Sequence, residues 1–166
     1  MSNRTMHAAV CAALTCGLLM AAAPASAALG GIPTPPPTGA VVNSLGPVAH
    51  VASGAAGATS TASYTVTQTT FASGTVVREY VSAAGTVFGI AWGGPTMPNL
   101  PVLLGTYFSQ YDSAVNALRA ARPGRGPLVI ELPGLVVHSG GHMGAFGGQA
   151  YVPSALPAGV SANDIQ

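Results

Sequence analysis

The chain has 166 residues, only 5% of which are charged, and its five basic residues are all arginines. Nucleic-acid binding needs several phosphate-neutralising lysines or arginines on one surface, and this chain has too few to build one. No nucleic-acid partner is therefore expected. The length corresponds to one domain that can bury a core without disulfide or metal staples.

Residues 1–27 have the pattern of a secretory signal peptide. Arg4 supplies a positively charged start, the stretch 8–23 is uncharged and apolar, and Ala25-Ser26-Ala27 provides the small residues that a signal peptidase reads. We expect cleavage between Ala27 and Ala28, and an exported protein that is periplasmic or secreted, with no transmembrane segment after cleavage. The alternative of an uncleaved anchor is disfavoured because the apolar run is shorter than the roughly 20 residues that span a bilayer.

Both cysteines, Cys11 and Cys16, lie inside the segment to be removed. A lipoprotein with Cys16 as the lipidated residue is disfavoured, because the residues before it match that signal poorly. The expected mature chain of residues 28–166 therefore has no thiol and no disulfide, and packing alone must stabilise it.

Residues 28–61 are rich in proline, glycine and alanine and are expected to form a largely disordered linker. Pro35-Pro36-Pro37 favours an extended spacer geometry. Val41, Val42 and Leu45 offer one short strand to the domain that follows.

The domain itself is expected over 62–152, and it begins with three strands at about 63–71, 75–82 and 86–92. These runs are rich in Thr, Val, Tyr and Phe, which suit a pleated, half-buried surface, and short glycine-containing segments separate them. An antiparallel meander follows. In the third strand the pattern places Thr86, Phe88, Ile90 and Trp92 together on the core face.

A helix is expected next, with Asn99 as its N-cap and a stop at Arg122-Pro123-Gly124. Apolar residues recur at three- and four-residue steps and predict one stripe against the sheet: Leu100, Leu104, Tyr107, Phe108, Tyr111, Val115 and Leu118. Gln110 and Asn116 are expected to face water. We interpret the cluster of Arg119, Arg122 and Arg125 as complementing the negative end of this helix, in preference to an anion site.

Three strand-like runs follow the helix, LVIEL, LVVHS and AFGGQAYV, and Pro133 leaves open whether the first two are one bent strand. A C-terminal tail is expected over 153–166. The pattern predicts an α+β fold in which an antiparallel sheet of about five strands, a three-strand meander followed by two to three further strands, curls around a single amphipathic helix.

The runs GTVVREYVSAAGTVFGIAW, GPTMPNLPVLLGTYF and GLVVHSGGHMGAFGGQAYVPSALPAGV resemble an uncharacterised family of short exported proteobacterial proteins, domain of unknown function 2844. The resemblance extends from about Ala28 to the C-terminus. It implies export, and it brings no activity, cofactor or catalytic residue.

The residues give little support to catalysis. The expected mature chain has no cysteine or lysine, no serine lies in a G-x-S-x-G turn, and no glycine-rich loop joins a strand to a helix as in phosphate-binding sites. Glu79 and Glu131 could form a carboxylate pair, but Glu79 beside Arg78 is interpreted as a surface charge of the sheet. No catalytic residue and no cofactor are predicted.

His138 and His142 are the candidate metal ligands, because two imidazoles and the Met143 thioether suit a soft metal such as copper. A two-residue turn at Gly140-Gly141 would place the two rings on opposite faces of the sheet and would pair Leu135 with Phe146. A three-residue loop would bring the rings together. The first arrangement is expected.

The leading hypothesis is a non-enzymatic envelope protein, a binding or accessory module that engages another protein or polymer. The alternative is a metal-binding or hydrolytic enzyme that uses His138 and His142 with a carboxylate.

Overall fold

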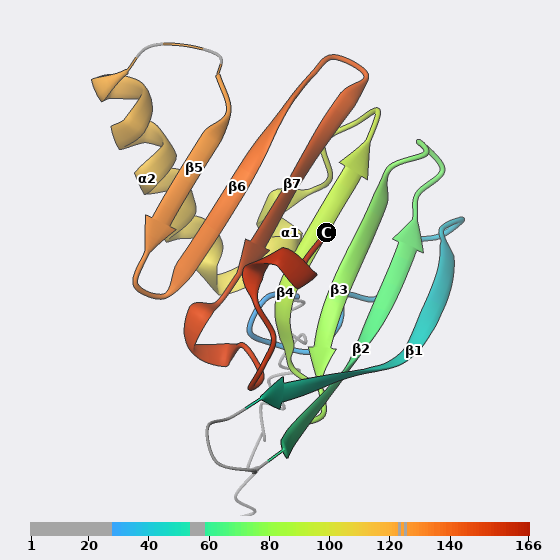
Figure 1. Ribbon diagram of the computed structural model, residues 1–166. Coiled ribbons are helices and arrows are strands. Elements are labelled where there is room, and N and C mark those ends of the chain that lie inside the picture. Colours follow the sequence, from blue (N-terminus) through green and yellow to red (C-terminus); the bar gives the residue numbers. More distant parts are fainter. Residues whose placement is uncertain (1–27, 54–58, 123, 125) are drawn as a thin grey trace, which may run out of the picture.

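The computed structural model describes residues 28–53, 59–122, 124 and 126–166, so the expected signal peptide, Ala27 and Arg125 lie outside the described residues. The fold is one antiparallel seven-stranded sheet with a single helical segment against one face (Figure 1). The strands are β1 (Val41–Ser53), β2 (Thr59–Thr70), β3 (Val76–Ser82), β4 (Val87–Gly94), β5 (Leu128–Leu132), β6 (Leu135–His142) and β7 (Ala145–Tyr151). The helical segment comprises α1 (Leu100–Leu104), the 3₁₀ turn η1 (Gly105–Tyr107) and α2 (Phe108–Ala121).

The strand order β1-β2-β3-β4-β7-β6-β5 joins two antiparallel meanders. β1 to β4 form the first, the helical segment then carries the chain to the far edge, and β5 to β7 return so that β7 pairs with β4. Gly74 and Gly85 have φ angles of 84° and 80° in the turns that flank β3, as the expected meander requires. The α+β prediction is confirmed in its class.

The sheet has seven strands where about five were expected. Pro133 and Gly134 form the turn between β5 and β6, so the two runs on either side of it are separate strands. β1 is the other addition, because the segment around Val41 and Leu45 pairs along the full length of β2 instead of forming one short strand.

The start of segment 28–61, which was expected to be a largely disordered linker, supplies part of the core in the structure. Ala28 and Leu29 are fully buried, and residues 29–31 form a short parallel bridge with Val87. Leu29 N–H donates to the Leu103 carbonyl at 3.0 Å, and Gly30 N–H donates to the Val87 carbonyl at 2.8 Å. Backbone pairing with distant residues holds this segment, and its own composition carries no sign of that pairing.

β4 is buried on both faces, because one core cluster lies on each side of it. A bulge in this strand reverses the faces to which successive side chains point. Tyr80 pairs with Gly89 and Val81 pairs with Val87, which leaves Phe88 as the extra residue of the bulge. Ile90 and Trp92 therefore pack in the core on the helical side, whereas Phe88 packs in a second cluster with Tyr64, Tyr80 and Ile165. The expected single face of Thr86, Phe88, Ile90 and Trp92 is wrong for this reason.

The second cluster lies under the C-terminal segment, which crosses the opposite face of the sheet from the helix (Figure 1). Ile165 is fully buried, and its side chain fills the space above Gly89. The Gln166 carbonyl accepts hydrogen bonds from Arg78 Nη1 at 2.8 Å and from the Tyr80 hydroxyl at 2.7 Å. Residues 153–166, expected as a tail outside the domain, therefore complete its core.

The apolar stripe of the helical segment is buried as predicted, but the segment is not one continuous helix. Leu104, Tyr111 and Val115 are buried, Phe108 is half-buried, and the Asn99 side chain caps α1 at Val102 N–H. Gly105 adopts a φ of 50° and ends α1 after one turn, so the helix restarts at Phe108. Asn116 is exposed as expected, whereas Gln110 is half-buried.

Candidate functional site

A hollow lies between α2 and the strands β5, β6 and β7, and we call it the helix–sheet groove. Its volume is about 880 Å³, which is within the range of ligand-binding pockets. Its lining residues are Met97, Tyr111, Leu118, Arg119, Arg122, Gly124, Gly126, Pro127, Leu128, Val129, Ser139, Gly140, Gly141 and Phe146.

The sheet side of the groove is lined by small residues of β6. Ser139, Gly140 and Gly141 line it, and the larger Leu128 of β5 and Phe146 of β7 lie beside them. The small side chains of β6 leave room between the sheet and α2. At the other end of the same strands, Leu135 and Val137 fill the space completely.

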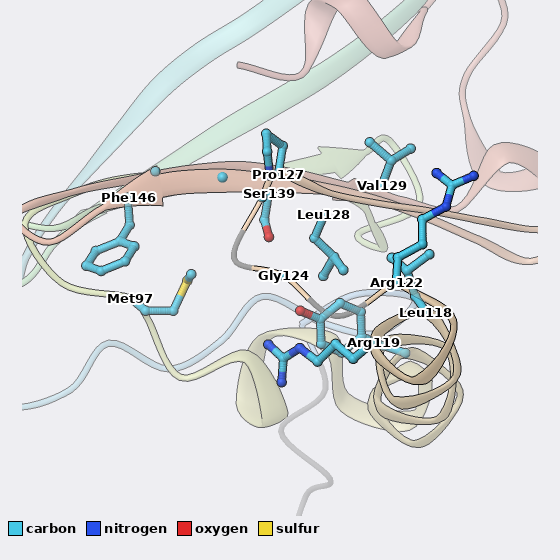
Figure 2. Close-up of a pocket in the computed structure, with 14 residues that line it drawn as sticks. Met97, Leu118, Arg119, Arg122, Gly124, Pro127, Leu128, Val129, Ser139 and Phe146 are labelled. Carbon is cyan, nitrogen blue, oxygen red and sulfur yellow. The ribbon is translucent and has the colours of Figure 1, made fainter.

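The lining of the groove is partly apolar and partly cationic. Met97 and Phe146 lie together at one end (Figure 2). Arg119 and Arg122 both come from the C-terminal end of α2, but their guanidinium groups point apart, Arg119 beneath the sheet toward Met97 and Arg122 toward Val129 (Figure 2). Neither guanidinium forms a hydrogen bond or an ion pair with any residue that the structure describes. The groove thus has an apolar end and two separate cationic groups at its border.

The floor of the groove carries two hydroxyl groups. The Ser139 side chain points from the sheet toward the helix, on the side of Tyr111 (Figure 2). Burial raises the pKa of the Tyr111 hydroxyl, while the positive charge of Arg119 opposes the rise. Tyr111 is therefore neutral at physiological pH, and the charged side chains among the described lining residues are Arg119 and Arg122.

The predicted turn at Gly140-Gly141 is wrong. Both glycines are inside β6, where they pair with Gly147 and Phe146, and the chain reverses at Met143-Gly144 instead. Gly141 has a φ of 127°, and a Cβ atom there would lie 2.2 Å from the Ala145 carbonyl oxygen, so this strand position requires glycine. Leu135 consequently pairs with Leu132 of β5 rather than with Phe146.

The structure does not bring His138 and His142 together. They are four positions apart on β6, which separates their Cα atoms by about 13 Å, and side chains stand roughly perpendicular to a sheet. His138 Nε2 lies 3.8 Å from Glu131 Oε1, whereas His142 Nδ1 lies 3.0 Å from the Met143 carbonyl oxygen. Within the described ranges, no group of three or more His, Cys, Asp and Glu side chains could hold a metal ion.

The carboxylates do not pair either. Glu79 on β3 and Glu131 on β5 are four strands apart in the sheet, or about 19 Å at the usual strand spacing. Glu79 is also not a surface charge, because the N-terminal segment covers it to 2% exposure and Thr34 N–H donates to its Oε1 at 3.0 Å. Burial raises the pKa of Glu79, and the Thr34 hydrogen bond opposes the rise.

Comparison with known proteins identifies a family without assigning an activity. The profile of the family described as "Protein of unknown function (DUF2844)" matches residues 25–165. The chain belongs to the DUF2844 family. No curated protein and no solved structure matches this DUF2844 chain.

Among the described residues of this DUF2844 protein, no helix has both the length and the apolar character needed to cross a membrane. Of the two residues at the expected cleavage point, Ala28 is the first described residue and is fully buried.

Sequence reasoning missed the groove itself. Arg119 and Arg122 were interpreted only through the helix end, and Met97 and Phe146 attracted no functional interpretation. The one available signal was compositional, since two of the chain's five basic residues stand three positions apart in an almost uncharged sequence.

Proposed function

We propose that this protein is an exported, non-enzymatic binding or accessory module of the cell envelope, and that it engages its partner through the helix–sheet groove. The observation that carries the proposal is the groove: a hollow of about 880 Å³ with an apolar wall and two arginines at its border. Its described lining contains no nucleophile beside a base and no pair of carboxylates, so the groove is suited to binding.

The export part of the proposal rests on the pattern of residues 1–27, and the accessory role rests on the absence of a catalytic motif in the sequence. Ser139 is the one hydroxyl nucleophile of the described lining, and its neighbour is the Tyr111 hydroxyl rather than a histidine. Catalysis by serine needs a base to remove the proton.

Site-specific crosslinking in living cells tests this proposal. A photoreactive phenylalanine analogue replaces Met97, whose side chain is 42% exposed at the groove, and in a control it replaces Ile32, which is 61% exposed elsewhere. Both sites are exposed, so both variants should fold. We expect one defined adduct in the envelope fraction from position 97 and none from position 32, with the adduct identified by mass spectrometry. Crosslinking from position 32 alone would overturn the proposal.

The rival hypothesis, a metal-dependent enzyme that uses His138 and His142, has its own test. Elemental analysis of protein purified from metal-supplemented cells would detect a stoichiometric metal. If His138→Ala or His142→Ala removed such a metal, the enzyme hypothesis would replace the binding hypothesis.

A further inference from the structure

The shape and the charge of the helix–sheet groove together indicate the chemical class of its ligand. Its apolar wall comes from Met97, Leu118, Leu128 and Phe146, none of which is fully buried. Apolar surface that stays accessible inside a recess is characteristic of a ligand site. The wall is suited to an alkyl chain.

The two arginines at the border of the groove add a second requirement. Arg119 and Arg122 are both exposed and unpaired among the described residues, and the nearest acid on α2, Asp112, is hydrogen-bonded to Asn116 at 3.1 Å. Asp112 also lies seven residues before Arg119, which is about 10 Å along the helix axis. Guanidinium groups bind carboxylate and phosphate oxygens in a fork geometry. The mouth of the groove is therefore complementary to an anion.

A role at the helix end does not account for this arrangement by itself. Basic side chains near a helix C-terminus stabilise the helix wherever they point around its axis. Here both of them border the groove, and no side-chain hydrogen bond from either to a helix carbonyl is formed in the described structure.

We infer that the helix–sheet groove binds a free single-chain amphiphile with an anionic head group, its alkyl chain against the apolar wall and its head group at Arg119, with Arg122 adding positive charge at the border of the groove. This inference rests on the proposed function, because it names the ligand class for the same groove.

Two other occupants fit the geometry less well. A membrane surface requires apolar side chains that protrude, whereas these line a recess between a helix and a sheet. An extended peptide carries backbone N–H and C=O groups that need partners. The described side chains of the groove floor offer two hydroxyl groups for this, those of Tyr111 and Ser139, which is too few for a strand of several residues.

The test is calorimetric titration of the full exported protein with dodecanoate, dodecanol and dodecyltrimethylammonium, each below its micelle concentration. We expect saturable binding in the order dodecanoate, dodecanol, dodecyltrimethylammonium. Shortening the chain from twelve to ten carbons should weaken binding about fifteenfold, because each of the two buried methylenes contributes about 0.8 kcal/mol.

Matched variants separate the charged and the apolar parts of the groove. The double variant Arg119→Gln, Arg122→Gln should weaken dodecanoate binding about tenfold, at two- to fivefold per exposed charge, and should leave dodecanol binding unchanged. The double variant Arg119→Lys, Arg122→Lys keeps the charge and should retain most of the preference for dodecanoate. Met97→Asn, which removes apolar surface without adding charge, should weaken dodecanoate and dodecanol alike.

The outcomes distinguish the ligand class from the site. Equal binding of dodecanoate and dodecanol would overturn the anionic head group, and binding to phosphatidylglycerol vesicles without binding of monomeric dodecanoate would overturn the single-chain ligand. A protein crosslinked from position 97 in cells, together with no amphiphile binding, would overturn this inference and leave the proposed function in place.

Discussion

Leu29 provides the sharpest test of whether the N-terminal segment belongs to the folded domain. Its side chain is fully buried in the core that also contains Val87, Leu103 and Leu104. Leu29→Ala removes three buried carbons, which corresponds to about 2 kcal/mol of transfer free energy. The cavity left behind adds to this loss, so we expect a decrease of about 2–5 kcal/mol in the free energy of unfolding.

Urea denaturation measures this decrease directly. With a slope of about 1–3 kcal/mol per molar urea for a domain of this size, the midpoint should fall by roughly 1 M or more at an unchanged slope. Ile32→Ala is the matched control, because Ile32 lies three residues further on and is 61% exposed. The control should change stability by less than about 0.5 kcal/mol. A similarly small effect of Leu29→Ala would mean that residues 28–40 are a linker after all.

Three further predictions concern charge, packing and processing. Burial raises the pKa of Glu79 above its ordinary value of 4.5, so the folded protein holds this proton more tightly than the unfolded chain; stability should fall as pH rises through the raised pKa. Urea midpoints measured between pH 4 and 8 test this. The midpoint of Glu79→Gln should not fall with pH in this way, and at neutral pH the variant should be more stable than the unaltered protein. If the variant and the unaltered protein had the same pH profile, Glu79 would not be buried as a charge. Gly148→Ala would place Cβ 2.4 Å from Trp92 Cζ2 and should cost about 1–3 kcal/mol in thermal or urea unfolding, whereas Gly93→Ala, with no atom within 4 Å, should not. Intact-mass measurement on the envelope fraction should give a mature chain that begins at Ala28, and a retained Met1 would contradict the export proposal.

The elements that the sequence predicts well are those with strong local signals. The alternation around Tyr64 and Val66, the glycines at 74 and 85 and the periodic stripe through Tyr111 each indicate one local structure. The meander and the facing of the helix follow from these alone.

The elements that it misses depend on contacts between distant residues. Leu29 is buried by Val87 and Leu103, and the bulge at Phe88 appears only when β3 and β4 pair. The last hairpin contains glycines at 140, 141, 144, 147 and 148, and several of them could form its turn. With the turn at Met143-Gly144, β6 and β7 form three more residue pairs after the pair of Ser139 and Gly148. The residue types at the turn do not by themselves reveal this gain.

The groove was missed for the same reason. Its lining includes Met97, Arg119, Arg122 and Phe146, which lie in three separate stretches of the chain. Only the crossover that carries α2 across the sheet brings them to one site.

The most direct test of the binding site is an NMR titration of the ¹⁵N-labelled exported protein with dodecanoate. We expect saturable shifts of the amides of Tyr111, Leu118 and Phe146, which line the helix–sheet groove and not the second hollow, and none at Ile32. Shifts centred on Gln149 and Ile165, which line a separate hollow on the opposite face, or no saturable change at all, would contradict the assignment of the groove as the ligand site.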